Sequence, residues 1–569
     1  MLELAGASFS FEGAARKAVS NVTMSVSPGE HVALVGANGS GKSTLARLTC
    51  GLIAPQEGRV LVDGRDASDR SMRGMVGLVQ QDPRDQIVSS LVSDEVAFGP
   101  RNLGLDPLEV SRRVDEALAA SGLEGFRDRA TGGLSGGEQQ RLAVAGILAM
   151  RPRYIVLDEA ASMLDGSARR KLRRLVAELA SERGMGVLSV THDALDVLDA
   201  DRVVVLDRRE VAWQGDARAF LALACADKGR LADVMRMDPY VRVALDVLGR
   251  GDGRAQCSAV PCDARALADP HGLARRWGAL APKDREEVRA GAVRLLSDSA
   301  RHAAPEEDGP FARRSAVSCV QRGLEARDVS FSYGDADALA GLSVDARPGR
   351  VVLLAGVSGS GKSTAARVLA GLYPPDKGEA LLKGSPVHPG DVGLTFQRPE
   401  DQLFCETVGK DIAFGLVERG VPEAEAEGRA LAAAEEFGMD RSMLGLSAYE
   451  LSGGYARRAA IASIAVLEPG AYVFDEPTAG LDCEGRRFMR DVVRSRACAG
   501  ASVVVVSHDV AEWLHVADKV AFIAGGTVVW HGDAAGACRG QPYEFAGMLA
   551  PEFVRLAEAL GACAGGGAL

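Results

Sequence analysis

A glycine-rich pattern occurs twice in this 569-residue chain and constrains its fold more than any other feature. The copies are G-A-N-G-S-G-K-S-T at 36–44 and G-V-S-G-S-G-K-S-T at 356–364. Each follows a short apolar run, at 31–35 and 351–355, and precedes a helix-like stretch. A strand, a glycine-rich turn and a helix in this order predict a loop whose backbone N–H groups bind phosphate.

The residue types of each loop indicate how phosphate would be bound. Glycines let the backbone turn so that successive N–H groups face an anion, and the following helix adds the positive end of its dipole. Lys42 and Lys362 are predicted to reach the β- and γ-phosphates. Ser43 and Ser363 are predicted to bind Mg²⁺. Two full matches in one chain make a chance occurrence an unconvincing explanation.

The rest of the chain repeats as well. Five landmark pairs are separated by nearly the same distance of 316 to 320 residues: Lys42 and Lys362, Gln81 and Gln397, Ser135 and Ser452, Asp158 and Asp475, and His192 and His508. A nearly constant offset indicates a duplicated domain of about 220 residues.

Each copy alternates apolar strand candidates with helical stretches, which predicts an α/β fold around a buried parallel sheet. The strand candidates are 155–157, 187–190, 203–206, 472–474, 503–506 and 520–523. We predict two tandem P-loop domains at 1–225 and 323–540. The segment 226–322 is predicted to hold the tail of the first domain and a linker, and 541–569 a C-terminal helical tail.

The composition narrows the classes of function. The chain is 47% hydrophobic and 25% charged, as in ordinary globular proteins, and its net charge of −11 disfavours nonspecific nucleic-acid binding. The closest cysteines, Cys257 and Cys262, have no second ligand pair nearby, so we expect reduced thiols rather than a metal site. Neither a signal peptide nor an apolar run near 18 residues is evident, so a membrane role is expected to depend on partners.

Each copy also contains an apolar strand that ends in two carboxylates, Asp158-Glu159 and Asp475-Glu476. At the carboxyl end of a parallel strand these side chains are expected beside the phosphate loop. The first carboxylate is suited to the Mg²⁺ shell and the second to polarising an attacking water.

Two further motifs accompany each phosphate loop. The turns Ser135-Gly136-Gly137 and Ser452-Gly453-Gly454 open predicted helices, which is compatible with a second anion site or with plain helix N-caps. Of the eight histidines, His192 and His508 follow an apolar strand and precede Asp. An imidazole at this position is suited to bonding the γ-phosphate and orienting water.

These motifs, in this order, resemble the ATPase domain of ATP-binding cassette (ABC) transporters over nearly all of 1–250 and 323–561. The resemblance implies two tandem ABC ATPase domains, each with a RecA-like parallel-sheet core, a helical subdomain and a small antiparallel β subdomain. It implies an intramolecular head-to-tail pair with two ATP molecules and Mg²⁺ between the halves.

The resemblance assigns residues to both sites. Site one would contain Gly36, Asn38, Gly39, Ser40, Gly41, Lys42, Ser43, Thr44, Gln81, Asp158, Glu159 and His192, with Ser452, Gly453, Gly454 and Asp482 from the other half. Site two would contain Gly356, Ser358, Gly359, Ser360, Gly361, Lys362, Ser363, Thr364, Gln397, Asp475, Glu476 and His508, with Ser135, Gly136, Gly137 and Asp165.

Within these sites the resemblance implies different roles. Glu159, His192, Glu476 and His508 would be catalytic, and the Mg²⁺ ligands would be Ser43, Gln81, Asp158, Ser363, Gln397 and Asp475. Phe11 and Tyr333 match the aromatic residue that stacks on adenine, although an aromatic residue there is also compatible with plain core.

Finer features resemble energy-coupling factor (ECF) importers. These features are the glutamine loops at 76–86 and 392–404, the runs at 94–99 and 411–415, and the motifs L-D-E-A-A-S-M-L-D at 157–165 and F-D-E-P-T-A-G-L-D at 474–482. The last two are similar to the family's two paralogous ATPases, here fused. The resemblance implies ATP-driven uptake of a vitamin or transition-metal ion from the cytoplasmic face of the cell membrane.

The implied partners are a transmembrane coupling protein, docking near Asp82–Gln86 and Arg398–Gln402, and a small substrate-binding membrane protein. Three residues depart from the family pattern: Tyr455 stands where Gln is usual, Gln80 where Phe is usual, and Ala161 where Thr is usual. We nevertheless expect two hydrolytic sites, because both glutamates and both histidines are present.

A rival function is that of soluble twin-cassette ATPases that act on ribosomes. Their linkers are strongly basic because they meet RNA, whereas 250–322 has 13 basic and 10 acidic residues and is interrupted by prolines. No nucleic-acid partner is therefore expected. A DNA-repair ATPase would need long heptad arms, and exporters usually carry a fused membrane domain; the sequence shows neither feature.

Overall fold

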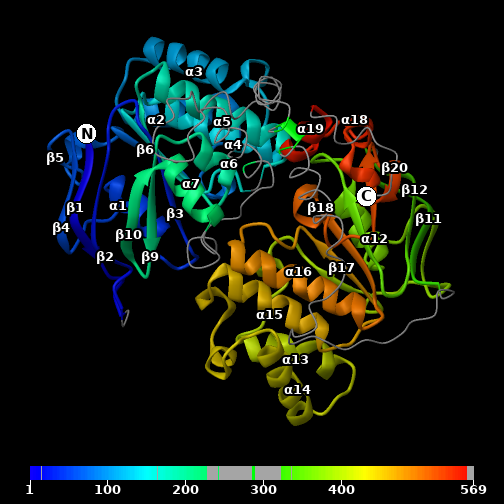
Figure 1. The fold of residues 1–569 in the computed structure, drawn as a ribbon. Helices are drawn as coiled ribbons and strands as arrows, with labels where there is room; N and C mark the ends of the chain where they lie inside the picture. Colours follow the sequence, from blue (N-terminus) through cyan, green and yellow to red (C-terminus); the bar gives the residue numbers. More distant parts are fainter. Residues whose placement is uncertain are drawn as a thin grey trace. The chain divides into compact units, whose positions relative to one another are not determined.

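The computed structural model describes residues 1–13, 16–162, 164–226, 322–334 and 336–559, with isolated residues at 241, 283, 285, 286 and 288. The chain divides into two compact units, Met1–Ala292 and Val293–Leu569 (Figure 1). Most of the predicted linker, including Cys257 and Cys262, lies outside the described residues, and of the helix that the sequence predicts near 283–296 only residues 283, 285, 286 and 288 are described, all of them helical.

The first unit is built around a six-stranded sheet with the order β10-β9-β3-β8-β7-β6. Its strands are β3 (His31–Gly36), β6 (Val76–Val79), β7 (Tyr154–Asp158), β8 (Gly186–Val190), β9 (Arg202–Asp207) and β10 (Glu210–Asp216). All neighbours are parallel except β10, which is antiparallel to β9. The strands predicted at 155–157, 187–190 and 203–206 are confirmed, and their continuous apolar runs are buried as a parallel sheet requires.

A second, antiparallel sheet in this unit has the order β2-β1-β4-β5. Its strands are β1 (Leu2–Phe9), β2 (Val19–Val26), β4 (Glu57–Val62) and β5 (Arg65–Asp66). The helices are α1 (Lys42–Thr49), α2 (Val92–Asn102), α3 (Pro107–Ser121), α4 (Gly136–Ala149), α5 (Gly166–Ser181), α6 (Ala194–Leu198) and α7 (Ala217–Ala226). Helices α2, α3 and α4 pack on one another as the predicted helical subdomain.

The second unit repeats this plan. Its six-stranded sheet contains, in spatial order, β16 (Gly393–Thr395), β17 (Ala471–Asp475), β18 (Ser502–Ser507), β13 (Val351–Ala355), β19 (Lys519–Ala524) and β20 (Thr527–Asp533). Its antiparallel sheet contains β12 (Ala336–Ala346), β11 (Leu324–Tyr333), β14 (Lys377–Leu382) and β15 (Ser385–Pro386). The predicted α/β fold with a small antiparallel subdomain is therefore confirmed in both units.

The helices of the second unit follow the same order. They are α12 (Lys362–Leu369), α13 (Val408–Glu418), α14 (Glu423–Glu436), α15 (Gly453–Ala465), α16 (Cys483–Cys498), α17 (Val510–Trp513), α18 (Gln541–Phe545) and α19 (Glu552–Ala559). Helices α13, α14 and α15 pack together as α2, α3 and α4 do (Figure 1).

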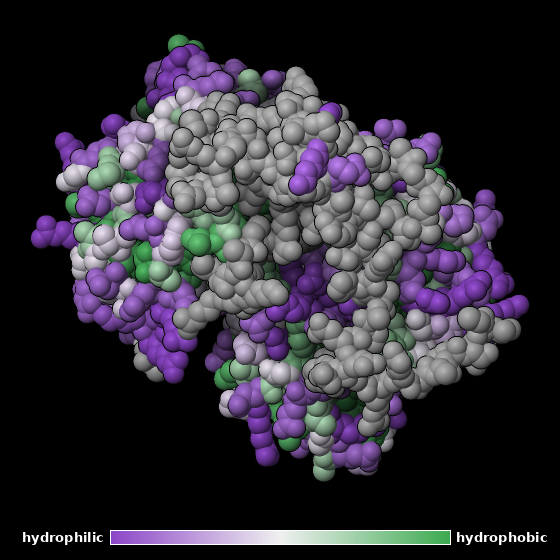
Figure 2. Space-filling model, viewed as in Figure 1, coloured by the Kyte–Doolittle hydropathy of each residue, from purple (hydrophilic) through white to green (hydrophobic). Residues whose placement is uncertain are grey.

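Apolar residues from both sheets of the first unit share one core. Leu4 of β1, Leu34 of β3, Leu45 of α1 and Leu188 of β8 belong to it and are fully buried. Burying each such side chain contributes about 1.5–3 kcal/mol, so this core fixes the phosphate loop between its strand and its helix. Figure 2 shows the complementary surface, where hydrophilic side chains predominate over the described part of the visible face.

Candidate functional site

The phosphate loops join β3 to α1 and β13 to α12, and their path requires glycine. Gly41 and Gly361 precede the two helices with φ of 102° and 100°, a region that L side chains rarely adopt. A Cβ atom at Gly36 would lie 2.4 Å from a backbone carbonyl oxygen of β9, and one at Gly356 would lie 2.4 Å from the equivalent oxygen of β19. The loop therefore passes where no side chain fits.

The loop lysines are buried and tied to their own loops. Lys42 Nζ donates to the carbonyl oxygens of Gly36 (2.8 Å) and Ala37 (3.0 Å). Lys362 Nζ donates to the equivalent carbonyl oxygens at 2.8 Å and 2.7 Å. The ammonium groups are thus held inside the loops where a phosphate would be bound.

Two loop hydroxyls lack hydrogen-bond partners in the described part of the chain. Ser40 Oγ and Ser360 Oγ are buried, and neither has an acceptor or donor within reach there. Buried polar atoms are nearly always satisfied in folded proteins, so these orphaned hydroxyls fit a loop that is completed by a phosphate.

In each half, two of the three residues predicted to hold Mg²⁺ lie together at the carboxyl edge of the sheet. Ser43 Oγ donates to Asp158 Oδ1 at 3.3 Å, and Ser363 Oγ to Asp475 Oδ1 at 3.3 Å. Burial raises the pKa of Asp158 above its usual value and that of Asp475 to about 6. A divalent cation with oxygen ligands would compensate this cost, so the donor set fits Mg²⁺.

The two glutamates follow these carboxylates in an uncommon backbone conformation. Glu159 and Glu476 have positive φ of 50° and 47°, which turns each side chain toward the histidine of its own half. His192 Nε2 lies 3.0 Å from Glu159 Oε1, whereas His508 Nδ1 lies 2.7 Å from Glu476 Oε1. Each glutamate is thus paired with the histidine of its own half, a contact that the sequence did not predict, and opposite ring nitrogens face the two carboxylates.

The glutamates also differ in their remaining partners. Gln81 Nε2 donates to Glu159 Oε2 at 3.3 Å, which places one predicted metal ligand on the neighbouring glutamate. Glu476 accepts from His508 and Ser507 instead. Burial favours a higher pKa for Glu476, but the charge of His508 and these hydrogen bonds outweigh it and hold the pKa below its usual value.

Both Ser-Gly-Gly turns begin a helix, and the two serines behave differently. Ser135 is the N-cap of α4: its hydroxyl accepts from the N–H of Glu138, whose carboxylate accepts from the Ser135 N–H at 2.7 Å. Ser452 is the N-cap of α15 without a capping bond from its side chain, and Tyr455, which stands in place of the glutamate, has no carboxylate to accept from the Ser452 N–H. The N-cap interpretation thus holds in full for the first half. The pairing of each turn with the other half's nucleotide stays a prediction.

The predicted adenine-stacking aromatics are about half exposed. Phe11 is 46% exposed and packs by its edge on Phe9, and Tyr333 is 47% exposed and packs similarly on Phe331. This exposure does not fit the alternative of plain core. The open ring faces remain available for stacking on a base.

Sequence reasoning missed two buried residues that brace the glutamine loops. Gln140 of α4 donates through Nε2 to the Gln80 carbonyl at 3.3 Å. At the equivalent position of α15, Arg457 donates through Nη2 to the carbonyls of Gln397 (2.8 Å) and Ala479 (3.4 Å), and burial lowers its pKa to about 10. Both residues stand three positions after the last glycine of Leu-Ser-Gly-Gly, so their equivalent place in the repeat was the available signal.

The segments predicted as docking sites form short 3₁₀ turns at Pro83–Asp85 and Pro399–Asp401. The glutamine that ends each segment points inward. Gln86 bonds the backbone of Gln80 and Leu78, and Gln402 donates to the Ala460 carbonyl at 2.6 Å. These two glutamines therefore shape the loops rather than present themselves to a partner.

Phosphate loops, Asp-Glu pairs and histidines at the edge of two parallel sheets define a tandem nucleotide-binding ATPase. Comparison with known proteins agrees: the model of the family described as ABC transporter matches residues 19–162 and 339–479. The chain belongs to the ABC transporter family, and it is an ATPase that binds ATP.

Some relatives match nearly the whole chain, and others match about one third of it. A Methanosarcina mazei protein named as an ABC transporter ATP-binding protein is 31% identical over 96% of this chain and 92% of its own length. A similarly named protein of Bifidobacterium longum is 32% identical over 90% of this chain, which spans 64% of that relative. The energy-coupling factor transporter ATP-binding protein EcfA1 of Clostridioides difficile is 42% identical over 36% of this chain and 74% of its own length. Among the described residues, no helix combines the length and apolar character needed to cross a bilayer.

Proposed function

We propose that this chain is the ATP-hydrolysing energy-coupling subunit of an ECF-type importer that drives uptake of a vitamin or transition-metal ion. The observation that carries the proposal is an exposed apolar surface beside each glutamine loop, where a membrane partner would dock. The 42% identity to an energy-coupling factor ATP-binding protein over 206 residues supports this assignment.

The docking surface of the second half is aromatic. Phe404, which follows the glutamine loop, is 69% exposed and packs edge to face on Phe414 of α13 at 4.9 Å, and Val417 beside it is 41% exposed. Large apolar side chains grouped on a surface mark interaction sites. An apolar helix end of the transmembrane coupling protein would cover this surface.

The first half has the corresponding surface. Val88, Leu91 and Phe98 are 65%, 39% and 50% exposed, and all three lie on α2 or between it and the glutamine loop. Two such surfaces in one chain suit a coupling protein that contacts both halves. The substrate-binding membrane protein would then be linked to this chain through the coupling protein, and this chain would lie on the cytoplasmic face of the cell membrane.

The residues of each half would share the work of ATP hydrolysis. Bound Mg²⁺ would be held by Ser43 and Asp158, and by their equivalents in the second half, and would neutralise charge on the β- and γ-phosphates. Lys42 would bind the same phosphates through its ammonium group. Glu159 would accept a hydrogen bond from the attacking water, and His192 would orient the γ-phosphate.

The second half would use Lys362, Glu476 and His508 in the same way. Each nucleotide would be completed by the Ser-Gly-Gly turn of the other half in an intramolecular head-to-tail pair. The N–H groups at the exposed starts of α4 and α15 suit this role, because a helix N-terminus attracts phosphate.

The partners can be tested by affinity purification from the native cell in mild detergent, with mass spectrometry of the retained proteins. We expect small polytopic membrane proteins with the wild-type chain and their loss with Phe404→Asp combined with Phe414→Asp. Phe437→Leu, which changes a fully buried aromatic residue, is a matched control that should retain them. Stoichiometric ribosomal proteins without membrane partners would contradict the importer.

The hydrolytic role of the glutamates can be tested separately. Glu159→Gln and Glu476→Gln keep the shape of the side chain but remove its charge, and each should lower ATP turnover by roughly 100-fold or more at its own site. Nucleotide binding, measured with a fluorescent ATP analogue, should remain. If one substitution leaves turnover unchanged, that half only binds ATP.

A further inference from the structure

The hydroxyl that precedes each site histidine has a different acceptor in each half. Thr191 and Ser507 occupy equivalent positions, and each oxygen accepts the backbone N–H two residues later, at 3.0 Å and 3.1 Å. A hydroxyl has one hydrogen to donate. The two halves therefore differ in which carboxylate accepts the hydrogen of this hydroxyl.

In the second half, the hydrogen goes to the glutamate. Ser507 Oγ donates to Glu476 Oε2 at 3.0 Å, and Ser507 is fully buried. The other carboxylate oxygen, Oε1, accepts from the backbone N–H of His508 at 2.9 Å and faces its Nδ1 at 2.7 Å. Both oxygens of Glu476 are thus held, which fixes the orientation of the carboxylate.

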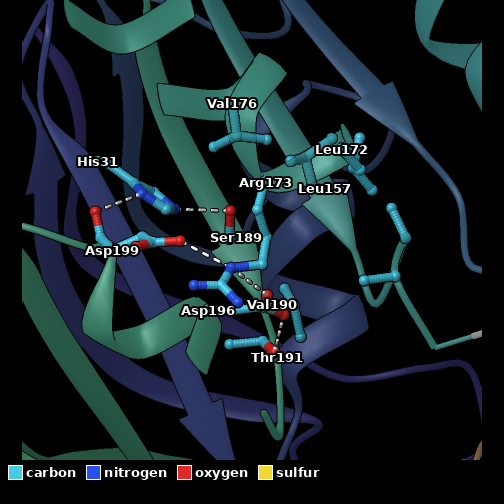
Figure 3. Close-up of a pocket in the computed structure, with 12 residues that line it drawn as sticks. His31, Leu157, Leu172, Arg173, Val176, Ser189, Val190, Thr191, Asp196 and Asp199 are labelled. Carbon is cyan, nitrogen blue, oxygen red and sulfur yellow. Dashed lines mark hydrogen bonds and ion pairs between the residues drawn. The ribbon is translucent and has the colours of Figure 1, made fainter. Parts of the chain in front are cut away.

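In the first half, the hydrogen goes elsewhere. Thr191 Oγ1 donates to Asp196 Oδ2 at 2.8 Å, at the bottom of the pocket drawn in Figure 3. The second oxygen of Asp196 accepts no hydrogen bond in the described part of the chain and lies 3.8 Å from Arg173 Nε. Arg173 Nε is instead 2.7 Å from Asp199 Oδ2. Asp196 therefore has one long ion pair, with Arg173, and a short hydrogen bond from Thr191.

The equivalent carboxylate of the second half, Glu512, forms ion pairs with two arginines. Glu512 replaces Asp196, is fully buried and lies 3.0 Å from Arg490 and 3.3 Å from Arg486. His515 stands where the first half has Asp199, so no competing carboxylate occupies that position. The longer side chain and the two guanidinium groups leave Ser507 available to Glu476.

The charges around Asp196 agree with this difference. Burial, together with the negative charge of Asp193, raises the pKa of Asp196 to about 6, against the opposing effects of Arg173, Thr191 and Arg169. His31, which also lines the pocket, is buried and bonds Ser189 and the Asp199 backbone instead (Figure 3). In its ionised form, the Asp196 carboxylate accepts a charge-assisted hydrogen bond from the Thr191 hydroxyl.

We propose that Ser507 is a positioning residue for Glu476, and that Asp196 withholds the equivalent Thr191 hydroxyl from Glu159. This inference rests on the proposed role of both glutamates in hydrolysis. Glu476 then receives a hydroxyl on one oxygen and a backbone N–H on the other, whereas Oε2 of Glu159 is held by the longer contact with the flexible Gln81 amide, so the second half has the more closely fixed glutamate. The two ATP sites of this chain are therefore unequal.

The test compares single variants of the full-length chain in steady-state ATP hydrolysis. Ser507→Ala should lower kcat roughly threefold to tenfold, the effect of one hydrogen bond, with KM for ATP unchanged. Ser507→Thr, which keeps the hydroxyl, should restore kcat. Thr191→Val, which removes the equivalent hydroxyl at nearly constant shape, should change kcat less than twofold. Equal effects of Ser507→Ala and Thr191→Val, or a rise in KM that accounts for the loss, would overturn the inference.

A second comparison tests Asp196 directly. In an Asp196→Asn chain, the amide can donate to Thr191 Oγ1, so the Thr191 hydrogen is released toward Glu159. Adding Thr191→Val to this chain should then lower kcat at least twofold, and no change would overturn the withholding role. Glu476→Gln separates a failure of the proposed function from a failure of this inference. If Glu476→Gln leaves turnover unchanged, the proposed hydrolytic role of Glu476 is wrong. If it abolishes turnover while Ser507→Ala has no effect, only the positioning role of Ser507 is wrong.

Discussion

The two halves match closely where they would touch nucleotide and differ in the layer behind it. The loop lysines lie 2.8 Å from the first loop carbonyl in both halves, and the serine–aspartate pairs are both at 3.3 Å. Phosphate chemistry tolerates little variation in these contacts. The duplicated motif has therefore kept its geometry although its surroundings have changed.

The layer behind the motif is where the halves diverge. In the first half Leu157, Ala160 and Ala161 line a pocket together with polar residues that include Thr191 and Asp196 (Figure 3). The second half has Phe474 and Pro477 at the first two positions and Thr478 at the third, each larger than its counterpart. The matching lysine and serine–aspartate contacts of the two loops therefore rest on supports that differ in volume, polarity and hydrogen bonding.

The largest expected effect tests the phosphate loops, whose geometry the two halves share. Gly36→Ala and Gly356→Ala each place a Cβ atom 2.4 Å from a backbone carbonyl oxygen, so the loop must move. Each should remove ATP binding at its own half, with affinity lowered roughly 100-fold or more. Titration of the full chain with a fluorescent ATP analogue should show one site lost in either variant. Gly132→Ala, where a Cβ meets nothing within 4 Å, should bind like wild type; a clearly unequal loss between the two loop variants would break the comparison.

The residues of the nucleotide-binding motif could be predicted from the sequence, but the hydrogen bonds of the residues behind the motif could not. Lys42, Asp158, Glu159 and His192 were predictable because each has a fixed chemical task and a fixed place after a strand. The acceptor of the Thr191 hydroxyl was not predictable, because it depends on whether Asp196 or its longer counterpart finds a cation in three dimensions. The inward direction of Gln86 and Gln402, which end the two predicted docking segments, also escaped prediction, since spacing does not reveal side-chain direction.

The next effect in size concerns the braces of the glutamine loops. Arg457→Met removes charge-assisted hydrogen bonds to two carbonyls, and should cost about 2–3 kcal/mol of local stability in the second half. Gln140→Met removes one neutral bond of 3.3 Å and should cost about 1 kcal/mol in the first half. Hydrogen exchange of the full chain, followed by mass spectrometry of peptides that cover 76–86 and 392–404, measures both. Equal loss of protection would show that the charge of Arg457 adds nothing to the brace.

The smallest effects are expected when Leu157 and Phe474, which occupy equivalent positions behind the motif, are each replaced by the other half's residue. Leu157→Phe should fill part of the pocket and stabilise the first half by up to about 1 kcal/mol, because the space already exists. Phe474→Leu should destabilise the second half by roughly 1–2 kcal/mol, since Phe474 is 1% exposed and stacks on Tyr472 at 5.9 Å.

Calorimetry of the full chain, with hydrogen exchange to assign each transition to its half, measures this exchange. Leu157→Ile, which conserves volume, should leave the first transition nearly unchanged. If Leu157→Phe lowers the temperature of the first unfolding transition as much as Phe474→Leu lowers that of the second, the pocket has no room for the larger side chain. The packing around Asp196 would then be as tight as that around Glu512, and the difference between the halves would reduce to charge and hydrogen bonding alone.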